Sequence, residues 1–257
     1  MEDQDAILAS RIELRFFNNI IDPINLQTGN GLSLDDRGQI RIKLSEELGD
    51  ILKTANAQIE NKQSLFDFVT KFANKLYQLN ELNLSRQCLE FAEIQCDHLT
   101  PKINFVKAKV FCINFLANCA KKELLPRKYI QTSPKLISRL LNVIEDLRKS
   151  LELIFDMSNK EQEEIHFLAL NSAKLIYETA NPMIWWNCGK YVTDSLIFAA
   201  ISMEAIINLC TMRHMKFRLK LYSCAIYSAL VQGSIKGEKI NSFLKVNFCF
   251  YYLKNKL

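Results

Sequence analysis

The sequence predicts an all-α protein built as an α-α helical stack, and three observations support this. The chain has only 7 glycines and 5 prolines in 257 residues, too few for the many tight turns of a sandwich, barrel or propeller. From Leu44 onward, apolar residues recur with the 3.6-residue period of an amphipathic helix. Polar or proline-containing segments separate these periodic stretches, as expected for short loops between helices.

Residues 1–43 are expected to form an N-terminal helix and a polar loop. An apolar cluster that ends at Ile21 favours the helix, and Pro23 with the glycine-rich stretch GNGLSLDDRG ends it. Residues 44–240 are then expected to form an α-helical repeat-like domain, and residues 241–257 a basic-aromatic tail.

Seven or eight helices are expected in the repeat-like domain. Ser45 is the expected N-cap of its first helix, Pro101 opens another, and Ser158 with Glu161 matches a capping box. Pro182 and the pair Trp185-Trp186 are expected to mark a loop between helices. The expected helices run over 44–59, 65–79, 84–99, 101–116, 136–154, 158–176, 191–209 and 212–232.

One hairpin follows the tetratricopeptide spacing, in which bulky residues alternate with small ones at helix crossings. The small residues allow two antiparallel helices to approach closely, and the large ones fill the groove between neighbouring hairpins. The matching positions are Val69, Phe72, Ala73, Leu76, Ser85, Leu89 and Ala92. A generic helical hairpin explains the same residues, so this single copy leaves both interpretations open.

Residues for catalysis or metal binding do not form a recognisable pattern. His98 lies near Cys88 and Cys96, and Cys112 and Cys119 follow, but these spacings are also those of buried cysteines at core positions. No nucleophile motif or pair of catalytic carboxylates is present. We therefore expect a protein that is not an enzyme and uses no metal or cofactor.

Cysteine usage and hydropathy indicate a location. The 8 cysteines include no CxxC pair, and the polar N-terminus does not match a signal peptide, which favours a reduced, intracellular protein. The longest uncharged run, Leu221 to Ile235, has 15 residues, so no membrane span is expected.

Basic residues gather near the C-terminal end of the chain. From Met212 onward there are nine lysines and arginines and one acidic residue, Glu238. Such a segment suggests an acidic partner, but a solvated helix face with a loose tail has the same composition and is the favoured interpretation. Nucleic acid is not an expected partner, because no known binding motif accompanies the charge. The candidate partner surface is Arg213, Lys216, Arg218 and Lys220.

The Trp185-Trp186 pair has two interpretations. An aromatic pair between helices usually covers the ends of a helical hairpin, and we favour that role. A stacking platform for a ligand or base is the alternative.

The segment FAAISMEAIINLCTMRHMKFRLKLY, residues 198–222, resembles the N-terminal helical region of cilia- and flagella-associated protein fifty-four, an axonemal central-apparatus family. A second, weaker likeness is carried by HFLALNSAKLIYETANPMI, residues 166–184, and the hairpin at 65–99 occupies a corresponding place. The positions that fit the family pattern as packing residues include Phe198, Ala199, Met203, Glu204, Phe217, Leu221 and Tyr222. Lys216 and Lys220 depart from it, since the family has threonine there.

This resemblance implies a tetratricopeptide-like solenoid fragment that serves as a structural scaffold of the ciliary or flagellar axoneme. It would act in cilium assembly and motility through contacts with other central-apparatus proteins, with tubulin as a further candidate partner. The implied location is the cytoplasm, the cytoskeleton and the cilium axoneme. A cytosolic tetratricopeptide-like peptide-binding adaptor is the alternative function. Because family members are far longer, we expect the ending VNFCFYYLKNKL to reflect a truncated or mispredicted gene product. Packing of its aromatic side chains on a missing neighbour is the alternative.

Overall fold

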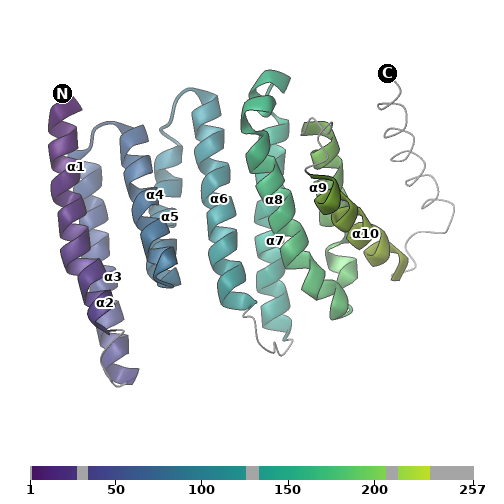
Figure 1. The fold of residues 1–257 in the computed structure, drawn as a ribbon, viewed down its shortest axis with the longest axis horizontal. Coiled ribbons are helices and arrows are strands. Elements are labelled where there is room, and N and C mark those ends of the chain that lie inside the picture. Colours follow the sequence, from purple (N-terminus) through teal and green to yellow (C-terminus); the bar gives the residue numbers. More distant parts are fainter. Residues whose placement is uncertain (1, 28–33, 126–132, 207–213, 232–257) are drawn as a thin grey trace. The chain divides into compact units, whose positions relative to one another are not determined.

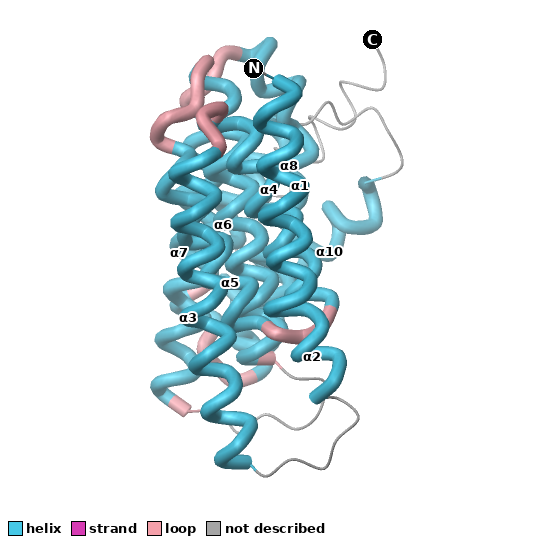
Figure 2. Tube along the Cα trace, turned by 90° about the vertical axis from the view of Figure 1, so that its left-hand side faces the viewer, coloured by secondary structure: helices cyan, strands magenta, loops and turns pink. Residues whose placement is uncertain are grey.

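The computed structural model describes residues 2–27, 34–125, 133–206 and 214–231, and these are helical with short connections (Figure 1). The described residues include no strand, as the tube in Figure 2 also shows. The prediction of an all-α helical stack is therefore confirmed. The chain divides into two compact units, Met1–Glu123 and Leu124–Leu257.

The described part of the first unit contains six α-helices and one π-helical segment. Its core is one apolar cluster, and each of these elements contributes side chains to it. The elements are α1 (Glu2–Phe16), the π-helix η1 (Phe17–Ile21), α2 (Asp22–Gln27), α3 (Leu34–Gln58), α4 (Lys62–Gln78), α5 (Leu82–Cys96) and α6 (Lys102–Leu124).

The hairpin predicted from the small residues is formed by α4 and α5. Ala73 and Ser85 are fully buried, and the Ser85 hydroxyl donates a hydrogen bond of 2.8 Å to the Ala73 carbonyl oxygen. This bond requires the two helix backbones to lie close together at the crossing. It also satisfies a hydroxyl that would be costly to bury alone.

An asparagine makes the sharp turn between α4 and α5. Asn80 has a positive φ of 64°, a conformation in which asparagine is tolerated better than most residues. The Glu81 amide then donates to the Leu76 carbonyl at 2.9 Å, which closes a Schellman motif. The second unit repeats this device at Asn187, where φ is 59° and the Cys188 amide donates to the Met183 carbonyl.

Helix α3 begins earlier than the sequence predicted. It starts at Leu34, so Ser45 lies inside the helix and is not an N-cap. Ser45 instead donates its hydroxyl to the Gln87 side-chain oxygen on α5, and the Gln87 amide donates back to the Ser45 carbonyl. The boundary predicted between residues 43 and 44 falls inside this continuous helix.

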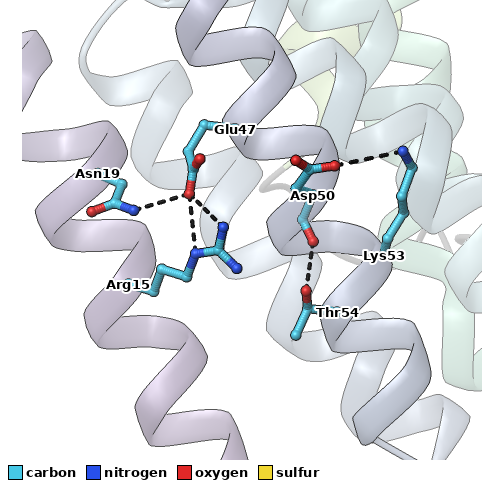
Figure 3. A network of polar contacts seen from close by, with 6 residues as sticks. All are labelled: Arg15, Asn19, Glu47, Asp50, Lys53 and Thr54. Atoms are coloured by element: carbon cyan, nitrogen blue, oxygen red, sulfur yellow. Dashed lines mark hydrogen bonds and ion pairs between the residues drawn. The ribbon is translucent and has the colours of Figure 1, made fainter.

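A polar network joins α1 and η1 to α3 (Figure 3). The Glu47 carboxylate accepts hydrogen bonds from the Arg15 guanidinium at 2.7 Å and from the Asn19 amide at 2.9 Å. These bonds, first that of Asn19 and then that of Arg15, hold the pKa of the Glu47 carboxyl below its ordinary value. Deeper in the unit, the rings of Phe16 and Phe72 stack with their centroids 3.7 Å apart.

Helix α6 is the one described helix that is long and apolar enough to cross a membrane by length and composition. Core helices of soluble proteins pass the same test. In this structure α6 supplies Ala108, Cys112 and Cys119 to the core of the first unit, and Lys109 on α6 forms an ion pair of 3.0 Å with Glu93 on α5.

Within its described residues, the second unit contains four α-helices and one short 3₁₀ segment. Ser133 caps the first of them ahead of Pro134, and the predicted capping box of Ser158 and Glu161 is confirmed at the start of the next. The elements are α7 (Pro134–Phe155), α8 (Asn159–Trp185), the 3₁₀-helix η2 (Gly189–Tyr191), α9 (Thr193–Ile206) and α10 (Met215–Val231).

Small hydroxyl residues also lie where α7 crosses α8. Ser150 and Ser172 are fully buried, and the Ser150 hydroxyl lies 2.9 Å from that of Ser172. Ser172 in turn donates to the Leu168 carbonyl at 3.0 Å, so both hydroxyls are satisfied.

The prediction that Pro182 marks the end of a helix is wrong. Helix α8 runs through Pro182 to Trp185 and ends in the Asn187 turn. Proline costs one backbone hydrogen bond in a helix interior, but burial of α8 side chains on both sides of it, at Ala180 and Met183, stabilises the helix.

The close approach of α7 and α8 predicts how substitutions at Ser150 act. Ser150→Leu should lower the free energy of unfolding by about 1–3 kcal/mol, because the larger side chain cannot fit between the helices. Ser150→Ala removes only a hydrogen bond and should cost about 0.5–1 kcal/mol. Urea unfolding followed by circular dichroism measures both. Leucine at the exposed Asn142 of the same helix is the control, and an equal cost at both positions would contradict the crossing geometry.

The lowered pKa of Glu47 predicts a pH-dependent contribution to stability. A carboxyl whose pKa is lower in the folded state stabilises the fold above its unfolded pKa, and this contribution is lost as the pH falls through the folded value. At pH 7, Glu47→Gln should lower the free energy of unfolding by about 0.5–1 kcal/mol, and the difference should vanish in acid. Glu46→Gln changes the same charge at an exposed neighbour, and an equal effect there would refute a specific role for Glu47.

Candidate partner-binding surface

The residues that carry the family pattern pack α9 against its neighbours. Ala199 and Met203 on α9 and Leu221 on α10 are almost completely buried. Phe198 is half-buried, with its ring 6.0 Å from that of Phe155 and 5.2 Å from the Arg148 guanidinium. These positions therefore serve packing within the second unit.

An ion pair joins Glu204, a residue of the family pattern, to Arg218 of the predicted partner surface. Arg218 on α10 donates to the Glu204 carboxylate on α9, with its Nε 3.1 Å from Oε1 and with its Nη2 also bonded. The Arg218 side chain is only 12% exposed. Although Arg218 was predicted to belong to the partner surface, its charge is satisfied inside the unit.

Phe217 and Tyr222 lie on half-buried positions of α10. The Phe217 ring meets that of Tyr177 edge to face at 5.9 Å. The Tyr222 hydroxyl is buried without a hydrogen-bond partner among the described residues. Both side chains are partly covered, so neither belongs to the exposed side of α10.

One face of α10 is exposed along its whole length. With 3.6 residues per turn, its exposed residues fall within an arc of about 100° and span about 21 Å. The members are Lys216, Leu219, Lys220, Ser223, Tyr227 and Leu230, and we call this set the α10 face. Lys216 and Lys220 of the predicted partner surface thus lie together on it, whereas Arg213 lies outside the described residues.

Trp185 extends the α10 face at its C-terminal end. Its ring centroid lies 6.4 Å from that of Tyr227, and the residue is 74% exposed. The prediction that the tryptophan pair lies in a loop and covers the end of a hairpin is wrong for Trp185, because Trp185 is the last residue of α8 and its side chain is exposed. Successive residues on a helix point about 100° apart, so Trp186 is half-buried while Trp185 faces outward.

A buried hydroxyl cluster holds the opposite side of α10 in place. The Ser228 and Thr193 hydroxyl oxygens lie 2.6 Å apart, and each lies 3.0 Å from the Gly189 carbonyl oxygen. This contact ties α10 to the start of α9 and to η2. The α10 face is therefore presented by a helix fixed along its inner side.

The cysteines considered as metal ligands are core residues, as predicted. Cys88, Cys96, Cys112 and Cys119 have no exposed surface, whereas His98 is exposed. Burial raises the pKa of the Cys88 and Cys119 thiols, and a hydrogen bond with Cys96 together with burial raises that of Cys112. The thiols of Cys88, Cys112 and Cys119 are thereby held in the neutral form, which neither attacks carbonyls nor binds metals well. The part of the chain that the structure describes contains no cluster of three or more metal-binding side chains.

The apolar members of the α10 face were not singled out by sequence reasoning. Leu219, Tyr227 and Leu230 lie within a run whose apolar residues surround the helix, so hydropathy alone does not separate the outer residues from the core. Lys216 and Lys220 identify the outer face in the sequence. Residues three or four positions apart lie on the same side of a helix, so Ser223, Tyr227 and Leu230 can be assigned in turn to the side that carries Lys220.

No protein-family model, curated protein or solved structure matches this chain.

The ion pair between α9 and α10 predicts unequal roles for the basic residues of α10. Arg218→Met should lower the free energy of unfolding by about 1–3 kcal/mol, because it leaves Glu204 without its partner at a partly buried site. Lys216→Met on the exposed face should change it by less than about 0.5 kcal/mol. Chemical denaturation of the two variants tests this, and equal effects would show that Arg218 has no special structural role.

Proposed function

We propose that the protein is a non-enzymatic structural scaffold of the ciliary or flagellar axoneme, within a projection of the central apparatus. It acts in cilium assembly and motility through contacts with other central-apparatus proteins, and tubulin is a further candidate partner. The proposal rests on the resemblance of residues 198–222 to the axonemal family. It requires no bound cofactor.

The observation that carries this proposal is the combination of a packed α9–α10 pair with an exposed outer face. Within the matching segment, Ala199, Met203 and Leu221 are buried, and Glu204 pairs with Arg218. A packing register of this kind supports a helical building block, and the α10 face gives that block an outward surface for helix-to-helix contact.

A scaffold role also agrees with the state of the cysteines. The four thiols in the first unit are buried and have no exposed surface, so none is placed to serve as a nucleophile. The exposed aromatic side chains of Trp185 and Tyr227 are of the kind enriched at protein interfaces.

The function is tested by following the tagged chain in ciliated cells. We expect it to remain with the axoneme after detergent extraction and to be concentrated along the central pair. As a control, a variant with Lys135→Glu and Lys160→Glu, both at exposed positions on other helices, should localise like the native chain. Signal confined to the detergent-soluble cytosol would refute the axonemal scaffold. Binding of extended peptides by that soluble pool would favour the cytosolic adaptor instead.

A further inference from the structure

We propose that the α10 face docks an acidic amphipathic helix of a partner protein. The proposal deepens the scaffold function by naming the chemistry of one partner and the surface that recognises it. It rests on the arrangement of exposed side chains along α10, on their charge, and on the aromatic side chains at one end.

Five residues of the α10 face have the spacing by which two helices pack alongside each other, and we call this line of residues the seam. Lys216, Lys220, Ser223, Tyr227 and Leu230 follow one another at intervals of four, three, four and three residues. This alternation keeps side chains in line along one side of a helix, and it is the pattern by which a second helix packs alongside. A seam about 21 Å long matches a partner helix of about four turns.

The charge of the seam selects the partner. Helix α10 contains no acidic residue, and neither Lys216 nor Lys220 forms an ion pair with another described residue. Both lysines lie in the first two turns, where the helix dipole adds to the positive potential. A partner with carboxylates opposite these turns is therefore favoured electrostatically.

The other end of the seam supplies apolar contact. Tyr227 and Leu230 are each about half exposed, at 50% and 49%, and Trp185 beside them is 74% exposed. Tryptophan and tyrosine contribute strongly to binding when they become buried in an interface. The fitting partner thus carries acidic residues toward one end of a helix face and apolar residues toward the other.

Two other occupants are disfavoured by charge. In a parallel pair of two copies, the lysines would face lysines, and in an antiparallel pair they would face the apolar ends. The segment that follows α10, residues 232–257, contains five lysines and one acidic residue, so its net charge has the same sign as that of the seam.

The test uses the purified full chain and two fluorescent helical peptides. One carries leucines along one face with glutamates at the two positions that oppose Lys216 and Lys220, and the other has lysines in place of those glutamates. We expect the glutamate peptide to bind at least tenfold more tightly at low salt, with the difference shrinking as salt rises. Fluorescence anisotropy measures both affinities.

Charge reversal at the seam should exchange the preference. In the variant K216E/K220E, we expect the glutamate peptide to bind at least tenfold more weakly and the lysine peptide to bind better than to the native chain. The variant K135E/K160E has the same net charge with an intact seam and should keep the native preference. An equal loss in both variants would overturn the proposal, as would absence of binding of the glutamate peptide to the native chain.

The apolar end is tested separately with Tyr227→Ser. Because Tyr227 is half exposed, the fold should survive, which circular dichroism checks, and binding of the glutamate peptide should weaken at least fivefold. A native chain that forms dimers at micromolar concentration, dissociated by Tyr227→Asp, would assign the face to a second copy and overturn the proposal.

The two proposals fail in different ways. Peptide binding with no axonemal enrichment in cells would contradict the proposed function and leave the docking surface intact. Axonemal enrichment with no peptide binding would contradict the docking surface alone.

Discussion

Close approach of paired helices is the constraint on which both units depend, and small hydroxyl side chains make it possible. Ser85 bonds the Ala73 carbonyl between α4 and α5, and Ser150 bonds Ser172 between α7 and α8. Each hydroxyl is buried yet satisfied, so it avoids the cost of an unpaired polar group. Since the side chains at the crossings are small, the larger apolar residues on either side interdigitate, and this positions the helices for the rest of the core.

Helix positions could be predicted from the sequence where apolar periodicity and capping signals coincide. Ser158 with Glu161 marked the start of α8, and the small residues Ala73 and Ser85 marked the α4–α5 hairpin. The start of α3 could not be predicted, because its first turns have a polar, loop-like sequence and Ile42 faces outward at 62% exposure. The extent of α8 was missed because Pro182 is tolerated where packing on both sides stabilises the helix.

The candidate surface could be predicted only in part, because its composition depends on contacts between helices. Lys216, Arg218 and Lys220 look equivalent in the sequence. Arg218 is set apart by Glu204, which lies 14 residues away on α9, and only the crossing of α9 and α10 brings the two side chains together. The sequence likewise predicts a loop at Trp185, whereas this residue is the last of α8 and its side chain is exposed.

The lysines of the α10 face lie at positions where their charge does not stabilise α10. Positive charge in the first turns of a helix opposes its dipole, and no acid within α10 offsets Lys216 or Lys220. The inner side of the same helix, in contrast, is fixed by the Ser228, Thr193 and Gly189 contacts and by the Arg218–Glu204 pair. The packing of the second unit therefore holds two unfavourable charges at a defined spacing on one helix. A carboxylate from outside would relieve both the repulsion between the lysines and their conflict with the dipole.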